Sequence, residues 1–160
     1  METKKYLYIF VLCTLSLCTF VGCKKDPEKE PETFVSNVTR PTWTAPAESD
    51  ITSSMTAVIK VDLKAQYPET AADWQRLDND LLAAFAGETC LGIGAWKEEA
   101  GAYWLYIAAP VTGNPSSVTL RYYSAHYKNL FIAADAFPFR NDDHLGTVAQ
   151  PLTPKFTVVK

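Results

Sequence analysis

The histidines and cysteines of this chain are the residues best suited to catalytic or metal chemistry, and they are few. The 160 residues include two histidines, His126 and His144, and only one cysteine, Cys90, beyond the N-terminal region. A reactive cysteine needs a neighbouring base and a zinc site needs clustered ligands, but both histidines fall in predicted loops without such partners. No Gly-x-Ser-x-Gly elbow occurs in the sequence. We therefore expect a non-enzymatic protein with no catalytic residues, no metal site and no cofactor, in which Cys90 packs as a small thiol.

Two acidic clusters carry the oxygen ligands that Ca²⁺ prefers: Asp78-Asn79-Asp80 and Asn141-Asp142-Asp143. Asp and Asn are also the common residues of turns, because their side chains bond to nearby backbone groups. Neither cluster has the spacing of an EF-hand loop. Turns are the favoured interpretation, and calcium binding by Asp78 and Asp80, or by Asp142 and Asp143, stays open.

Aromatic side chains give the clearer indication of a binding role. In a predicted strand at 102–109, Trp104 and Tyr106 point to the same face, and Tyr123 points outward from the next predicted strand. Such side chains on adjacent antiparallel strands lie within reach of one another. Flat rings with a polar edge bind sugars or protein partners. Trp104, Tyr106 and Tyr123 are therefore candidate ligand-binding residues.

Other segments of the chain could cover this aromatic face. The loop at 131–139, or Trp43 in the segment Pro41–Pro46, could cover the same surface and turn it into a second core. Trp74, in the loop before a predicted hairpin, is a separate candidate for an exposed ligand contact.

Short alternating runs separated by turn residues carry these side chains, which is typical of an all-β protein. Gly92 and Gly94 interrupt one run and indicate a bulge. A turn or two near Ala71–Leu77 is the only plausible helix. With about seven strands and no βαβ period, we expect an antiparallel immunoglobulin-like β-sandwich, with a barrel as the alternative. The predicted strands are 55–63, 81–86, 89–96, 102–109, 117–124, 130–134 and 155–159.

Composition and charge fit this class. Hydrophobic residues make up 48% of the chain and charged residues 21%, as in an ordinary globular domain. The net charge of -3 argues against a protein that binds nucleic acid through bulk positive charge.

The N-terminus has the layout of a secretory signal. Lys4 and Lys5 precede the uncharged run Tyr6–Gly22, which falls short of a comfortable membrane span. The run ends in Phe20-Val21-Gly22-Cys23, which resembles a bacterial lipobox, although Phe20 stands where Leu is usual. This resemblance implies that Cys23 becomes the lipidated first residue of the mature protein. An ordinary secreted protein and an uncleaved anchor are the alternatives.

The residues after Cys23 are strongly charged. The run 24–32 contains two prolines and cannot bury apolar surface, so we expect a solvated tether. The expected organisation is a signal peptide at 1–22, a lipidated cysteine with a flexible tether at 23–50, and a β-sandwich at 51–160. Cys-Lys-Lys-Asp resembles the charged export signal of Bacteroidetes surface lipoproteins. It implies an outer-membrane protein anchored at Cys23 and facing the cell surface, with a periplasm-facing protein as the alternative.

The rest of the chain resembles a small β-sandwich module found in secreted and surface proteins of the Bacteroidetes. The likeness covers most of Met55–Phe156 and consists of packing and turn patterns, so it transfers no catalytic set. It is carried by Ser54–Val61, Asp80–Cys90, Arg121–Ala125, Lys128–Phe131 and Phe137–Phe139.

From these features we expect a non-catalytic, lipid-anchored surface module that binds a glycan or a protein. A structural or accessory lipoprotein of an outer-membrane complex, without a ligand of its own, is the main alternative. A hydrolase with a site built on His126 or His144 is a third.

Overall fold

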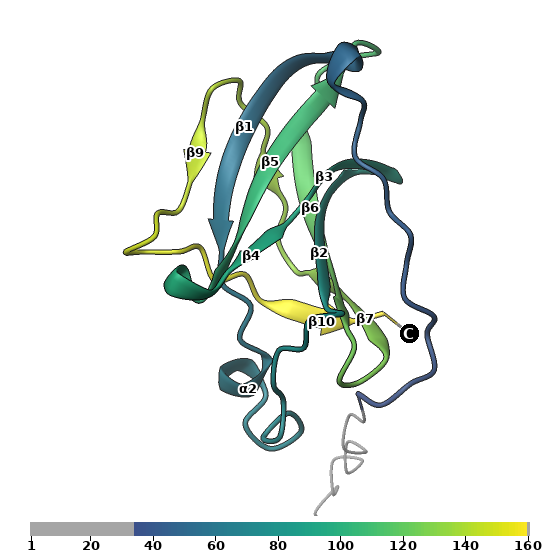
Figure 1. Ribbon diagram of the computed structural model, residues 1–160, viewed down its shortest axis with the longest axis vertical. Helices are drawn as coiled ribbons and strands as arrows, with labels where there is room; N and C mark the ends of the chain where they lie inside the picture. The colour runs from purple at the N-terminus through teal and green to yellow at the C-terminus, as the bar shows by residue number, and fades with distance from the viewer. Residues whose placement is uncertain (1–33, 160) are drawn as a thin grey trace, which may run out of the picture. The chain divides into compact units, whose positions relative to one another are not determined.

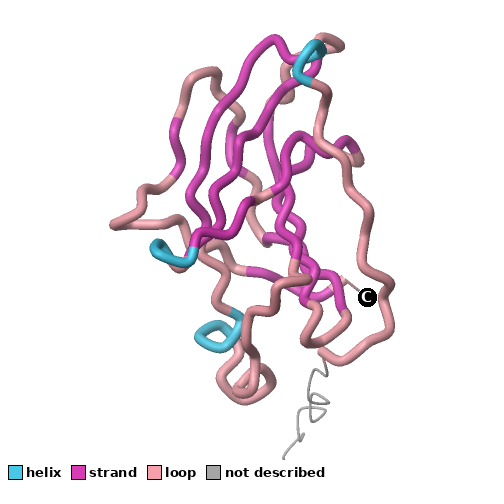
Figure 2. Tube along the Cα trace, in the orientation of Figure 1, coloured by secondary structure: helices cyan, strands magenta, loops and turns pink. Residues whose placement is uncertain are grey.

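Two β-sheets packed face to face make up residues 34–159, the part of the chain that the computed structural model describes (Figures 1 and 2). The expected all-β antiparallel sandwich is confirmed, with ten strands in place of about seven. The predicted signal peptide and the lipidation site at Cys23 lie outside the described residues. Within residues 34–159, no helix is long and apolar enough to span a membrane.

The first sheet has the strand order β4-β5-β1-β9. Its two long central strands, β1 and β5, pair antiparallel along their whole length. β4 continues the antiparallel pairing on one side, whereas β9 adds to the other side of β1 as a short parallel strand. The strands are β1 (Ile51–Ile59), β4 (Ala95–Lys97), β5 (Ala102–Pro110) and β9 (His144–Leu145).

The second sheet has the strand order β10-β7-β6-β2-β3, and β8 pairs with the first residues of β6. β2 and β6 have the bounds that the sequence predicts. β2 is a short apolar run bounded by turn residues, and β6 begins with an alternating pattern after a turn. The strands are β2 (Leu81–Ala86), β3 (Thr89–Ile93), β6 (Ser117–Ser124), β7 (Asn129–Ala133), β8 (Phe137–Pro138) and β10 (Phe156–Val158).

The helical content differs from the prediction. The α-helix is α2 (Leu63–Gln66), and the side chain of Asp62 caps it by accepting a 2.9 Å hydrogen bond from the backbone N–H of Ala65. The predicted helix near Ala71–Leu77 is wrong, since residues 71–73 form a bend and a turn and residues 74–77 are irregular. Two single 3₁₀ turns complete the list, η1 (Glu48–Asp50) and η2 (Glu98–Ala100).

The core lies between the sheets and is built from every second residue of the long strands. β1, β5 and β6 each direct three apolar or aromatic side chains inward, as their period of two predicts. Burial of these side chains is the main force that holds the sheets together. The residues are Met55, Ala57 and Ile59, then Tyr103, Leu105 and Ile107, then Val118, Leu120 and Tyr122, all almost completely buried.

The chain crosses from the second sheet to the first between β3 and β4, so the single strand predicted at 89–96 is two strands. Ala84 pairs with Gly92 and Phe85 with Cys90, which leaves Leu91 as the extra residue of a bulge, as the glycines indicated. At the crossing, β3 lies directly against β5. A Cβ on Gly92 would lie 2.0 Å from the backbone oxygen of Tyr106. Only glycine permits this approach.

We expect Gly92→Ala to lower the free energy of unfolding by about 2 kcal/mol or more, because the new methyl group overlaps backbone that cannot rotate away. Urea denaturation of the purified protein measures the change. Thr89→Ala, at the exposed start of the same strand, is the control and should stay within about 0.5 kcal/mol of the wild type. Equal stability of the two variants would contradict the close approach.

Phe34 belongs to the folded unit, although it lies in the segment predicted to be a flexible tether. Its side chain is 2% exposed. The ring makes edge-to-face contacts with Tyr67, Tyr127 and Phe131, at centroid distances of 4.8, 5.8 and 5.4 Å. The prediction of a tether is therefore wrong for this residue.

The residues between Phe34 and β1 run along the second sheet (Figure 1, right-hand side). The backbone N–H of Val38 donates a 2.9 Å hydrogen bond to the carbonyl of Lys128. Further along, the ring of Trp43 packs edge-to-face on Phe85 of β2, with centroids 5.2 Å apart. The tether prediction is thus corrected for residues 34–50, which cover the outer face of the second sheet.

Phe34→Ala should destabilise the protein by about 3 kcal/mol or more, since it removes a buried ring and leaves a cavity. Thermal or chemical unfolding of the variant measures this loss. The neighbouring Val35 is 75% exposed, so Val35→Ala is a matched control with little expected change. A Phe34→Ala variant as stable as the control would mean that the segment contributes nothing to the fold.

Candidate functional site

A groove on the outer face of the first sheet is the main candidate for a binding site. It has a volume of about 670 Å³, and β1, β4, β5, β9 and the loop after β9 line it. Trp104 and Tyr106 are its two aromatic lining residues, with exposed fractions of 42% and 53%. Large aromatic side chains exposed together on one face indicate a surface that contacts a ligand.

The strand pattern of β5 explains why these two rings share a face. Trp104 and Tyr106 alternate with the buried core residues of the strand, so both must point away from the core. They lie two residues apart, a separation of about 6.6 Å along a strand. Trp104 lies between Val58 of β1 and Ala95 of β4, and small neighbours such as these leave its ring accessible.

The polar side of the groove is formed where β9 joins β1. Thr56 pairs with Tyr106 on one side and with His144 on the other. Its Oγ1 lies 2.5 Å from His144 Nδ1, and this contact restrains the imidazole ring.

The wall of the groove follows from a turn at Gly146. This residue has a φ of 69°, and an added Cβ would lie 2.7 Å from the carbonyl oxygen of Val58. Glycine therefore lets the chain after β9 stay close to β1. The next two residues, Thr147 and Val148, line the groove.

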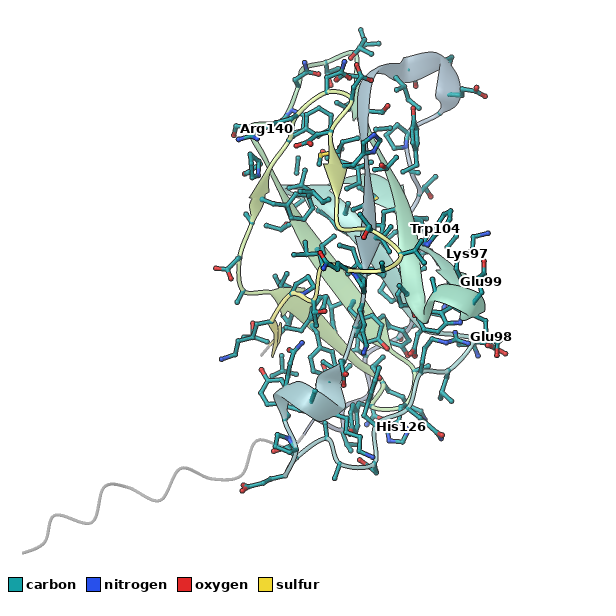
Figure 3. The ribbon with its side chains drawn as sticks, turned by 90° about the vertical axis from the view of Figure 1, so that its left-hand side faces the viewer. Lys97, Glu98, Glu99, Trp104, His126 and Arg140 are labelled. Carbon is teal, nitrogen blue, oxygen red and sulfur yellow. The ribbon has the colours of Figure 1, made fainter. Side chains whose placement is uncertain are left out.

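Lys97, the last residue of β4, supplies the positive charge of the groove. Its Nζ lies 5.8 Å from the centroid of the Trp104 ring, within the range of a cation–π contact. Figure 3 shows both side chains together at one flank of the sheet.

Tyr123 does not belong to this site. β5 and β6 lie in different sheets, so the prediction that Tyr123 lies on a strand adjacent to Trp104 and Tyr106 is wrong. Tyr123 does point to an outer face, but residues 34–50 cover that face and leave it only 5% exposed. Its hydroxyl donates a 3.3 Å hydrogen bond to the carbonyl of Val38.

Trp74 and Cys90 also lie apart from the groove. Trp74 is half-buried and packs against the core, so it offers less surface than an exposed contact would. Cys90 is half-buried, and burial raises the pKa of its thiol, which keeps it in the less reactive protonated form.

Asp80 has a structural role at the start of β2. Its carboxylate accepts hydrogen bonds from the Tyr122 hydroxyl, from the N–H of Ala125 at 2.7 Å and from the N–H of Leu77 at 3.1 Å. Burial raises the pKa of Asp80, and these hydrogen bonds oppose the rise. Asp78 is exposed and pairs with Arg76 at 2.8 Å. Protein donors thus occupy both carboxylate oxygens of Asp80 and one of Asp78.

The second acidic cluster forms a turn beside β1. Asn141 accepts a 2.9 Å hydrogen bond from the N–H of Ser54 and donates one of 2.8 Å to Asp142. Asp143 accepts from the N–H of His144 at 2.9 Å. Within residues 34–159, no group of three or more His, Cys, Asp or Glu residues is placed to hold a metal ion.

The two histidines have separate surroundings. His126, on the turn after β6, lies 3.3 Å from Asp73, whose other oxygen accepts a 2.8 Å hydrogen bond from the Tyr127 hydroxyl. The hydrogen bond from Tyr127 and, to a smaller extent, the contact with His126 hold the pKa of Asp73 below its ordinary value. His144 instead lies in the groove with Thr56.

The sequence identified Trp104 and Tyr106 but missed the rest of the groove. Lys97 and His144 become site residues only through the pairing of the short strands β4 and β9, which leave no clear period in the sequence.

Comparison of the chain with known protein families, with curated proteins and with solved structures finds no match. Its function is therefore inferred from its own residues.

Proposed function

We propose that this protein is a non-catalytic, lipid-anchored module of the cell envelope that binds a glycan in the groove of the first sheet. The observation that carries the proposal is the exposure of Trp104 and Tyr106 side by side on β5. Aromatic faces stack on the apolar faces of sugar rings, and the hydroxyl and imidazole groups beside them exchange hydrogen bonds with sugar hydroxyls.

The pairing of the sheet favours a glycan over a peptide strand. A peptide that extends a sheet needs a free strand edge. Both edges of β1 and both edges of β5 are already paired, so the floor of the groove offers side chains. The free edges of this sheet are those of the short strands β4 and β9, at the margins of the groove. A ligand recognised through ring faces and hydroxyls suits such a surface.

The membrane attachment rests on Cys23 and the lipobox-like residues before it. Ten residues, 24–33, separate Cys23 from Phe34 and can span at most about 35 Å. That length, shorter than the tether expected from sequence, still lets a small domain present a groove beyond the headgroups. The charged run after Cys23 supports an outer-membrane location facing the cell surface.

Trp104→Ala should weaken glycan binding about 30-fold, because a central aromatic contact is typically worth about 2 kcal/mol of binding free energy. An oligosaccharide array, followed by calorimetry on the best ligand, makes the measurement. Trp43→Ala removes a tryptophan that packs against the outer face of the second sheet and is the matched control, with unchanged affinity expected.

Failure of the wild-type protein to bind any glycan would contradict the proposed function. Co-purification with a single integral membrane protein, together with no binding to any oligosaccharide on the array, would instead identify an accessory lipoprotein. Equal loss of affinity in both tryptophan variants would place the ligand elsewhere.

Cys23→Ala should abolish acylation, because the modified thiol is then missing. Metabolic labelling with a fatty-acid probe and fractionation of the envelope test this, with loss of label and loss of normal membrane attachment expected. Cys90→Ala is the control and should keep its label. Persistent label on Cys23→Ala would refute the lipid anchor.

A further inference from the structure

Cations stacked on aromatic rings recur in this fold, and the first example is Arg76. Its guanidinium lies 4.4 Å from the centroid of the Trp96 ring. A terminal nitrogen of the same group lies 2.8 Å from a carboxylate oxygen of Asp78. The cation therefore has a ring on one side and an anion on another.

Arg121 repeats the arrangement on the second sheet. Its guanidinium lies 4.2 Å from the centroid of the Phe85 ring. Both terminal nitrogens donate to Glu88, at 2.7 and 2.9 Å, as a bidentate pair. Here too the cation on the ring has a carboxylate of the protein as its partner.

Lys97 is the third cation on a ring, and it differs in one respect. Its Nζ lies over Trp104, but no carboxylate of residues 34–159 lies within ion-pair distance of it. Glu98 and Glu99 follow it on η2 (Figure 3), and neither lines the groove. The anion that accompanies the other two cations is missing at Lys97.

The groove also differs in charge from the rest of the protein. The chain has a net charge of -3, yet no Asp or Glu lines the groove, and Lys97 is its one permanently charged residue. His144, with Nδ1 beside Thr56, adds a second group that can donate from Nε2 to an acceptor. The groove of this acidic protein is thus lined by a lysine and by no carboxylate, beside two aromatic rings.

We propose that the ligand is an acidic glycan, containing a uronic or sialic acid residue whose carboxylate pairs with Lys97 Nζ. The adjoining sugar ring stacks on Trp104 and Tyr106, and its hydroxyls bond to His144 and Thr147. This inference rests on the proposed function and specifies its ligand class. The ligand carboxylate would pair with Lys97 as Asp78 pairs with Arg76 and Glu88 with Arg121, so that each cation on a ring has an anionic partner. A charge-assisted hydrogen bond of this kind is stronger than a neutral one.

The test compares each acidic oligosaccharide with its own methyl ester, which keeps the sugar and removes the charge. Galacturonate, glucuronate, mannuronate and sialic acid oligomers cover the class. The full-length protein in detergent should bind at least one acid about tenfold more tightly than its ester. Raising the salt concentration should weaken binding of the acid and leave the ester unaffected.

Lys97→Gln should reduce affinity for the acid about tenfold and leave affinity for the ester unchanged. Lys64→Gln, which removes the same charge from α2 outside the groove, is the matched control and should bind like the wild type. Unfolding curves of both variants check that the fold is intact.

The outcomes separate this inference from the proposed function. If acids and esters bind equally well and Trp104→Ala weakens both, the groove binds glycans but the acidic ligand class is wrong. The same holds if Lys97→Gln keeps the full preference for the acid. If no oligosaccharide of any charge binds, the inference and the proposed function fail together.

Discussion

The close approach of β3 to β5 at Gly92 is the constraint on which the architecture of the groove depends. Two backbones meet there with no room for a side chain, since a Cβ would lie 2.0 Å from the carbonyl oxygen of Tyr106. This contact lets the chain leave the second sheet and enter the first two residues later, as β4. The crossing in turn places Ala95 and Lys97 beside Trp104. A bulkier residue at position 92 would therefore disturb the fold and the groove at once.

Both outer faces of the sandwich carry aromatic residues, but one face is covered and the other is exposed. Residues 34–50 cover the face that contains Phe85 and Tyr123, and the ring of Trp43 packs there. The face that contains Trp104 and Tyr106 has no such cover among residues 34–159 and stays open as a groove. Apolar surface that no segment of the chain buries favours contact with a ligand. Residues 34–50 therefore decide which of the two aromatic faces stays exposed.

The charge of the groove restricts its possible ligands more than its shape does. Rings alone would accept many flat or apolar ligands, since stacking is tolerant of chemical detail. Lys97 has no carboxylate partner among residues 34–159 and lies in a protein with an excess of acidic residues. This is the basis on which we propose that the groove selects ligands that carry a negative charge. The fixed imidazole of His144 adds a hydrogen-bonding direction. In the proposed complex, stacking supplies contact area, whereas Lys97 and His144 supply selectivity.

The sequence by itself determined the all-β class, the strands β2 and β6, and the outward direction of Trp104 and Tyr106, because these depend on local patterns. The pattern is a period of two in β5 and β6, and a short apolar run between turn residues in β2. The tertiary structure decided which strands are neighbours and which faces are covered. Alternation correctly directed Tyr123 outward, but its burial depends on a segment more than seventy residues earlier in the chain. The parallel pairing of β9, which brings His144 to Thr56, likewise depends on contacts between distant residues that no local pattern encodes.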